Sequence, residues 1–141
     1  MEILKEKDRT NFAEIFRSIT EQVTLVMFTQ EMECPPCHMT RGLLEEVSHL
    51  SDTITLETYE FVQDREKATA LGVDKIPATV LLGDRDYGIR FFGSPAGYEF
   101  NALIQDIIDI GKRSPGLPQD ITDDLAALTQ PVHLQVLVSP T

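Results

Sequence analysis

The stretch that decides the fold is residues 23–37, Val-Thr-Leu-Val-Met-Phe-Thr-Gln-Glu-Met-Glu-Cys-Pro-Pro-Cys. It begins with an apolar run of strand length and ends with the only two cysteines of the chain, Cys34 and Cys37. A C-x-x-C pair at a strand-to-helix junction places the first thiol at a helix N-terminus, where free backbone N–H groups and the helix dipole favour a thiolate. The second thiol follows one turn later, within reach of a mixed disulfide. The stretch therefore predicts a buried strand leading into a dithiol–disulfide redox centre.

Hydrophobic periodicity outlines the other elements of the chain. Their order gives a βαβ unit followed by a ββα unit, which predicts an α/β fold. We expect a four-stranded mixed sheet with helices on both faces and an extra N-terminal helix. The expected elements are a helix capped by Asn11 with Phe12, Ile15, Phe16 and Ile19 on one face, a strand at 23–29, a helix from the cysteines to about residue 50, a strand at 54–62, a helix at 65–71, a strand at 78–82, a turn at 83–88, a strand at 89–92 and a helix at 100–111.

The C-terminal part of the chain resembles its beginning. Residues 19–29 and 128–138 share a pattern in which a short helical segment runs into an apolar strand. The offset is 109 residues, the difference between positions 128 and 19. As an orphan strand, residues 132–138 should dock on a sheet edge or pair with another copy of the chain. The expected parts are a redox domain at 1–112, a linker at 113–119, and at 120–141 the helix and first strand of a truncated second repeat.

Composition excludes several classes of function. The 141 residues are 42% hydrophobic and 25% charged, as in a globular domain. A formal net charge of -11 argues against a nucleic-acid or anionic-membrane partner. No apolar stretch approaches the roughly 20 residues that span a bilayer, and the charged start does not resemble a signal peptide. We therefore expect a cytoplasmic protein, where a lone C-x-x-C is catalytic or metal-binding rather than structural.

The arrangement resembles the thioredoxin and glutaredoxin superfamily from about residue 10 to residue 112. A second signature of that family is Ile76-Pro77, ahead of the predicted strand at 78–82. The resemblance implies a cis Ile76–Pro77 bond in a loop that lies against the cysteines. Residues 90–100, Arg-Phe-Phe-Gly-Ser-Pro-Ala-Gly-Tyr-Glu-Phe, are most similar to the N-terminal unit of the two-unit protein disulfide oxidoreductases (glutaredoxin-like proteins) of thermophilic archaea and bacteria. The repeat in the tail agrees with such a two-unit organisation.

The resemblance implies an enzyme that exchanges disulfides and dithiols with protein substrates. Cys34, at the helix end, should attack, and Cys37 should resolve the mixed disulfide. Electrons would come from a thioredoxin reductase-like flavoprotein, and no bound cofactor or metal is expected. The residues expected to contact the substrate are Pro35, Pro36, Ile76 and Pro77.

Two departures from the family concern the cysteines. Thioredoxins carry a buried Asp on the strand before the motif, whereas residues 25–28 contain no acid. Glu31, Glu33 and Glu60 are candidates for assisting Cys37, although each is also typical of a solvated surface. The sequence leaves that role open.

The second departure is the proline at position 36. Pro36 has no backbone N–H, so it cannot donate to the Cys34 sulfur, whereas the N–H of Cys37 remains. Loss of one donor should raise the pKa of Cys34 and make the centre more reducing.

Other interpretations of the motif stay open. The signature C-x-x-C-H, which ends at His38, is formally that of c-type haem attachment, but such attachment requires export. Zinc needs four ligands, and the chain has two cysteines and three scattered histidines. Glutathione could bind at Pro77 and Thr79, although Lys75 is the only basic residue nearby. A non-catalytic interaction module with an idle C-x-x-C is the remaining alternative.

Overall fold

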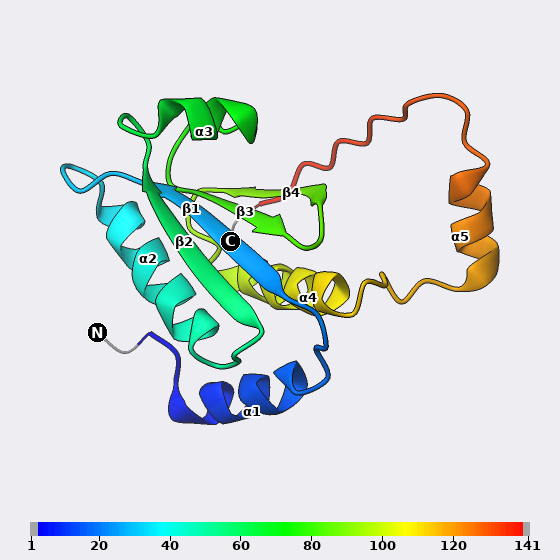
Figure 1. The fold of residues 1–141 in the computed structure, drawn as a ribbon, viewed down its shortest axis with the longest axis horizontal. Coiled ribbons are helices and arrows are strands. Elements are labelled where there is room, and N and C mark those ends of the chain that lie inside the picture. The colour runs from blue at the N-terminus through cyan, green and yellow to red at the C-terminus, as the bar shows by residue number, and fades with distance from the viewer. Residues whose placement is uncertain (1–2, 140–141) are drawn as a thin grey trace.

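The computed structural model describes residues 3–139 and shows a four-stranded sheet in the order β2-β1-β3-β4 (Figure 1). Strand β1 (Val23–Thr29) pairs in parallel with β2 (Ile54–Glu60) and antiparallel with β3 (Ala78–Leu82). Strand β3 pairs antiparallel with β4 (Asp86–Phe92). The predicted mixed α/β sheet is confirmed. The outermost residues of the first and last predicted parts, 1–2 and 140–141, lie outside the described residues.

Helices cover both faces of this sheet (Figure 1). Helices α1 (Glu6–Phe16), α2 (Pro35–Ser48) and α4 (Phe100–Gly111) pack on one face, and α3 (Arg65–Ala70) packs on the other. A 3-10 turn, η1 (Gly97–Glu99), precedes α4. Along β1 the side chains alternate between the two clusters: Leu25 and Met27 face the first, and Val26 and Phe28 face the second. Because both faces are covered, β1 is apolar almost throughout.

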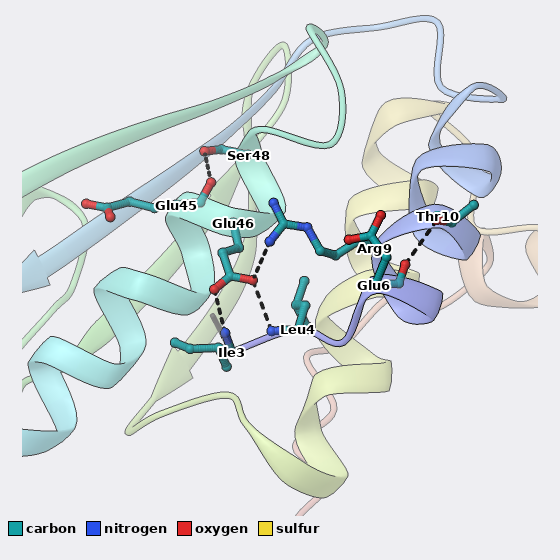
Figure 2. Close-up of polar contacts among 8 residues, drawn as sticks. All are labelled: Ile3, Leu4, Glu6, Arg9, Thr10, Glu45, Glu46 and Ser48. Carbon is teal, nitrogen blue, oxygen red and sulfur yellow. Dashed lines mark hydrogen bonds and ion pairs between the residues drawn. The ribbon is translucent and has the colours of Figure 1, made fainter. Parts of the chain in front are cut away.

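The first helix begins earlier than the sequence predicted. Asn11 lies inside α1, which starts at Glu6, so the predicted cap is wrong. The reason is a contact between distant parts of the chain, drawn in Figure 2: the Glu46 carboxylate accepts the backbone N–H groups of Ile3 and Leu4, at 2.6 and 3.0 Å. The Arg9 guanidinium reaches the same carboxylate at 3.5 Å. These contacts fix residues 3–4 on α2, so that the helix can begin directly after them.

The same contacts set the acidity of Glu46. Burial alone would raise the pKa of its carboxyl group. The backbone N–H groups of Ile3 and Leu4 and the charge of Arg9 favour the carboxylate and outweigh burial, so the pKa of Glu46 lies below its usual value. The carboxylate is therefore the stable form in the folded protein.

The hairpin between β3 and β4 also differs in detail. Strand β4 begins at Asp86 rather than at Ile89, which leaves residues 83–85 as the loop. The Asp86 carboxylate accepts two hydrogen bonds from the Arg90 guanidinium, at 2.6 and 2.9 Å. Arg90 also donates to the carbonyl of Leu71 at 2.9 Å, which ties β4 to the end of α3. This pairing of side chains extends the strand towards the turn, and the predicted loop of more than two residues is confirmed.

The C-terminal residues form a helix and an extended segment apart from this body. Helix α5 (Gln119–Ala126) lies away from the sheet, at the end of an extended linker (Figure 1). Residues 132–138 join no strand of the described sheet and are exposed. The expected docking on a sheet edge is therefore not found for these residues. Pairing with another copy, and the division into parts, remain predictions. None of the helices in residues 3–139 is long and apolar enough to cross a membrane.

Candidate redox site

Cys34 and Cys37 are joined in a disulfide, with their Cα atoms 5.2 Å apart. Cys34 is the N-cap residue of α2, and Pro35 and Pro36 are its first two helical residues. Proline suits these positions because the first N–H groups of a helix have no partner within the helix. Cys37 is fully buried, whereas Cys34 is 8% exposed. Cys34 is therefore the more accessible of the two residues.

Backbone hydrogen bonds hold the first turn of α2. The N–H of Cys37 donates to the carbonyl of Cys34 at 3.0 Å, and the N–H of His38 approaches the same oxygen at 3.4 Å. One turn later, the Thr40 hydroxyl donates to the carbonyl of Pro36 at 2.8 Å. The Cys37 N–H, which the sequence left for the Cys34 sulfur, thus bonds to a carbonyl while the disulfide is closed.

The loop before β3 lies at the same end of the sheet as the disulfide. The Ile76–Pro77 bond is cis, as the family resemblance implied. The N–H of Gly93, after β4, donates to the carbonyl of Pro77 at 2.8 Å and fixes the loop from the other side. Ala78, which follows Pro77, pairs with Phe28 near the end of β1 that leads into the cysteines. The topology therefore brings Pro77 and the C-x-x-C motif to one edge of the protein.

A cavity of about 590 Å³ lies beside the motif, on the side of β2. Met32 is 78% exposed there. Glu60 lies opposite Thr29 in the parallel pairing, and its carboxylate accepts the N–H groups of Val62 and Gln63, at 2.9 and 3.3 Å. Sequence reasoning assigned no role to Gln63, although the parallel register of the two strands was the signal that could have placed it. The residues that line this cavity are Gln30, Glu31, Met32, Glu33, Glu60 and Gln63.

Comparisons with known proteins agree with this geometry. No model of a known protein family matches the chain. The F subunit of alkyl hydroperoxide reductase in Staphylococcus epidermidis is 31% identical over 102 residues, which are 72% of this chain and 18% of that protein. The NTD_N/C domain of alkylhydroperoxide reductase AhpF from Enterococcus faecalis matches with a TM-score of 0.81 and 29% identity, over 90% of this chain and 62% of that one. A protein disulfide oxidoreductase from Aeropyrum pernix matches with a TM-score of 0.78 and 24% identity, over 91% and 56%.

The chain has a thioredoxin-like fold, so the predicted fold is confirmed. Cys34 and Cys37 form a disulfide, which fits the predicted C-x-x-C redox pair. The chain spans about a fifth of the length of the curated relatives that it matches, 18% for the first of them. The activities of those longer proteins therefore bear on this chain only as proposals.

None of the three acidic candidates is buried with Cys37 in this thioredoxin-like domain. Glu31 and Glu33 are exposed, and Glu60 is engaged with the turn after β2. Residues 25–28 of β1 are apolar and fully buried. Within residues 3–139, the buried polar side-chain atoms without a hydrogen-bond partner are instead the hydroxyl oxygens of Thr79 and Ser94. Sequence reasoning missed Ser94 and considered Thr79 only for glutathione, although a threonine in an apolar strand was a usable signal.

The structure also bears on the alternative ligands. His38 is exposed on α2, and no group of three or more His, Cys, Asp or Glu side chains in residues 3–139 could hold a metal ion. Lys75, the cation considered for glutathione, lies 3.2 Å from the Asp74 carboxylate and 4.9 Å from the centre of the Phe92 ring. Its charge is therefore partly compensated by a neighbouring acid.

Proposed function

We propose that this chain catalyses thiol–disulfide exchange on protein substrates through Cys34 and Cys37. The observation that carries the proposal is the closed disulfide at the start of α2, in which Cys34 is 8% exposed and Cys37 is fully buried. In the reduced protein, the Cys34 thiolate attacks a substrate disulfide and releases one substrate thiolate. Cys37 then attacks Cys34, closes the disulfide and releases the second substrate thiolate. Two electrons thereby pass from the dithiol to the substrate.

The surroundings of the disulfide support a substrate that binds as an extended peptide. Pro35 and Pro36 are exposed beside Cys34, and Ile76 is half-buried in the loop that ends at the cis proline, Pro77. Pro35, Pro36 and Ile76 offer apolar contact, and the two prolines of the motif bring no competing backbone N–H donor. Pro77 is buried and shapes the loop through its cis bond. We assign substrate contact to these four residues and the reacting sulfurs to the two cysteines.

An electron donor is part of the proposal. A thioredoxin reductase-like flavoprotein would return the disulfide to the dithiol form, and the similarity to a component of alkyl hydroperoxide reductase supports a reductive role. A reducing, cytoplasmic setting suits such a cycle. The match to the Enterococcus faecalis domain covers 90% of this chain, so it extends beyond the predicted redox domain at 1–112. This extent supports the assignment of the tail to a second thioredoxin-like unit.

The test is the reduction of insulin by dithiothreitol, followed by turbidity. The wild-type protein should accelerate the reaction, and Cys34→Ser should return it to the uncatalysed rate because the attacking sulfur is gone. Cys37→Ser should trap a mixed disulfide with the substrate, visible as a higher-mass species on a non-reducing gel. Ser48→Ala, at the far end of α2, is the matched control and should keep the wild-type rate.

A folded wild-type protein that leaves the insulin reaction at the uncatalysed rate would contradict the proposal and favour the non-catalytic module. A reaction accelerated only when glutathione is supplied would instead favour the glutaredoxin alternative.

A further inference from the structure

Three buried threonine and serine hydroxyls near the redox site have different surroundings. Thr40 is fully buried, and its hydroxyl donates to the carbonyl of Pro36. Thr79 is equally buried, yet its hydroxyl oxygen has no partner within residues 3–139, and the same holds for the hydroxyl of Ser94. Because a buried polar group without a partner is destabilising, such a group calls for an explanation.

The position of Thr79 connects it with Cys37. Thr79 pairs with Met27 across β1 and β3, so both side chains point to the same face of the sheet. Met27 packs in the cluster that includes Leu44 of α2. Cys37 lies seven positions before Leu44, on the same buried side of that helix. Thr79 and Cys37 therefore lie on the face of the sheet that α2 and α4 cover, towards the end where β1 leads into the motif.

The Cys37 sulfur differs as a hydrogen-bond acceptor for the Thr79 hydroxyl in the two redox states. In the closed disulfide the Cys37 sulfur is uncharged and a weak acceptor. Once the disulfide opens, Cys37 becomes a buried thiol, and burial raises the pKa of such a group because the charged form loses its hydration. The β1 residues beside it supply no acid. A neighbouring O–H donor would favour the thiolate that resolution of the mixed disulfide requires.

We propose that the Thr79 hydroxyl, without a partner while the disulfide is closed, donates a hydrogen bond to the Cys37 sulfur once the disulfide opens. It would take the place of the buried acid of thioredoxins, and the inference rests on the proposed exchange activity. In the resolving step, Cys37 loses its proton to water, its electron pair forms the bond to the Cys34 sulfur, and the substrate sulfur leaves as a thiolate. Thr79 keeps its own proton and stabilises the attacking sulfur.

The test is the reduction potential of Thr79→Val, measured in dithiothreitol buffers with thiol alkylation. Valine keeps the shape of the side chain and removes the hydroxyl. At a pH where Cys37 is ionised, the thiolate should lose a bond that the disulfide never had, so the equilibrium should shift about tenfold towards the disulfide, a potential about 30 mV more negative. The oxidised variant should be at least as stable as the oxidised wild-type protein. Thr79→Ser restores a hydroxyl and should return the potential towards the wild-type value.

Two controls separate this role from simple packing. Thr40→Val removes a hydroxyl that is bonded within α2, so it should lower stability in both redox states and leave the potential unchanged. Ser94→Ala removes the other hydroxyl without a partner. A wild-type potential for Thr79→Val, or a shift that follows Ser94→Ala instead, would overturn the inference while leaving the exchange activity in place. A wild-type protein without a reversible disulfide would overturn both.

Discussion

Two segments of similar sequence have opposite surroundings in this protein. Strand β1 lies between β2 and β3, and Leu25 at its centre is fully buried. Residues 132–138 repeat its apolar pattern but pair with no strand in the described chain, and Leu134, the counterpart of Leu25, is 85% exposed. An apolar pattern therefore suits a segment to a sheet, whereas neighbouring strands and helices decide whether the segment is buried.

The largest expected effect comes from truncating the two matched leucines. Leu25→Ala should lower the free energy of unfolding by about 2–5 kcal/mol, because it leaves a cavity in the closed core. Leu134→Ala should change it by less than about 0.5 kcal/mol, because the side chain is exposed. Denaturant unfolding of both variants in the oxidised state measures the difference. Equal losses of unfolding free energy at the two positions would show that the tail is packed in solution, which contradicts the contrast between the two segments.

The two ends of the described chain also differ, because only the first is tied to the body. Glu46→Gln should lower the free energy of unfolding by about 1–2 kcal/mol, since the amide binds the N–H groups of Ile3 and Leu4 more weakly than the carboxylate does and loses the ion pair with Arg9. The control, Glu45→Gln, changes the exposed neighbour on the same helix turn (Figure 2) and should have little effect. A loss of the same size in both variants would mean that the charge of α2, rather than the contact with residues 3–4, is responsible.

A smaller effect is expected at β4, the edge of the sheet. The hydrogen bonds from Arg90 and from the backbone of Gly88 lower the pKa of Asp86 to about 2. Because this value lies below the unfolded pKa of about 3.9, the ionised group stabilises the fold above pH 4, and that contribution is lost as the pH falls towards 2. Its size should be about 1 kcal/mol, since the Asp86 side chain is 38% exposed and water screens the pair.

The check on Asp86 is thermal unfolding between pH 2 and pH 5. Asp86→Asn should be less stable than the wild-type protein at pH 5 and close to it at pH 2. A stability difference between Asp86→Asn and the wild-type protein that stays constant from pH 2 to pH 5 would show that the carboxylate does not act through its ionisation.

The smallest effect is expected from removing the tail. A chain that ends at Leu117 should keep the free energy of unfolding of the full chain to within about 0.5 kcal/mol, because the residues of α5 and 132–138 are exposed. Sedimentation velocity tests whether residues 132–138 pair with another copy. If they do, the full chain should sediment as a dimer and the shortened chain as a monomer. Loss of folding on truncation would show that the tail supports the body.

The sequence predicted those features that depend on local pattern. The apolar run of β1 and the C-x-x-C motif were sufficient to place the central strand and the disulfide, whereas the cis Ile76–Pro77 bond was predicted from the family resemblance. The start of α1 could not be predicted, because it depends on contacts of Ile3 and Leu4 with Glu46, 43 and 42 positions away. The isolated hydroxyl of Thr79 could not be predicted either, because the absence of a partner is a property of the packed interior.

The measurement that tests the central claim most directly is a redox titration of the Cys34–Cys37 pair in dithiothreitol buffers, with alkylation of the free thiols and mass spectrometry. We predict one reversible two-electron transition, with a potential between about -180 and -300 mV. Two outcomes would contradict a redox function for this domain: both thiols stay alkylated at every buffer potential, so that no disulfide forms, or the disulfide never opens.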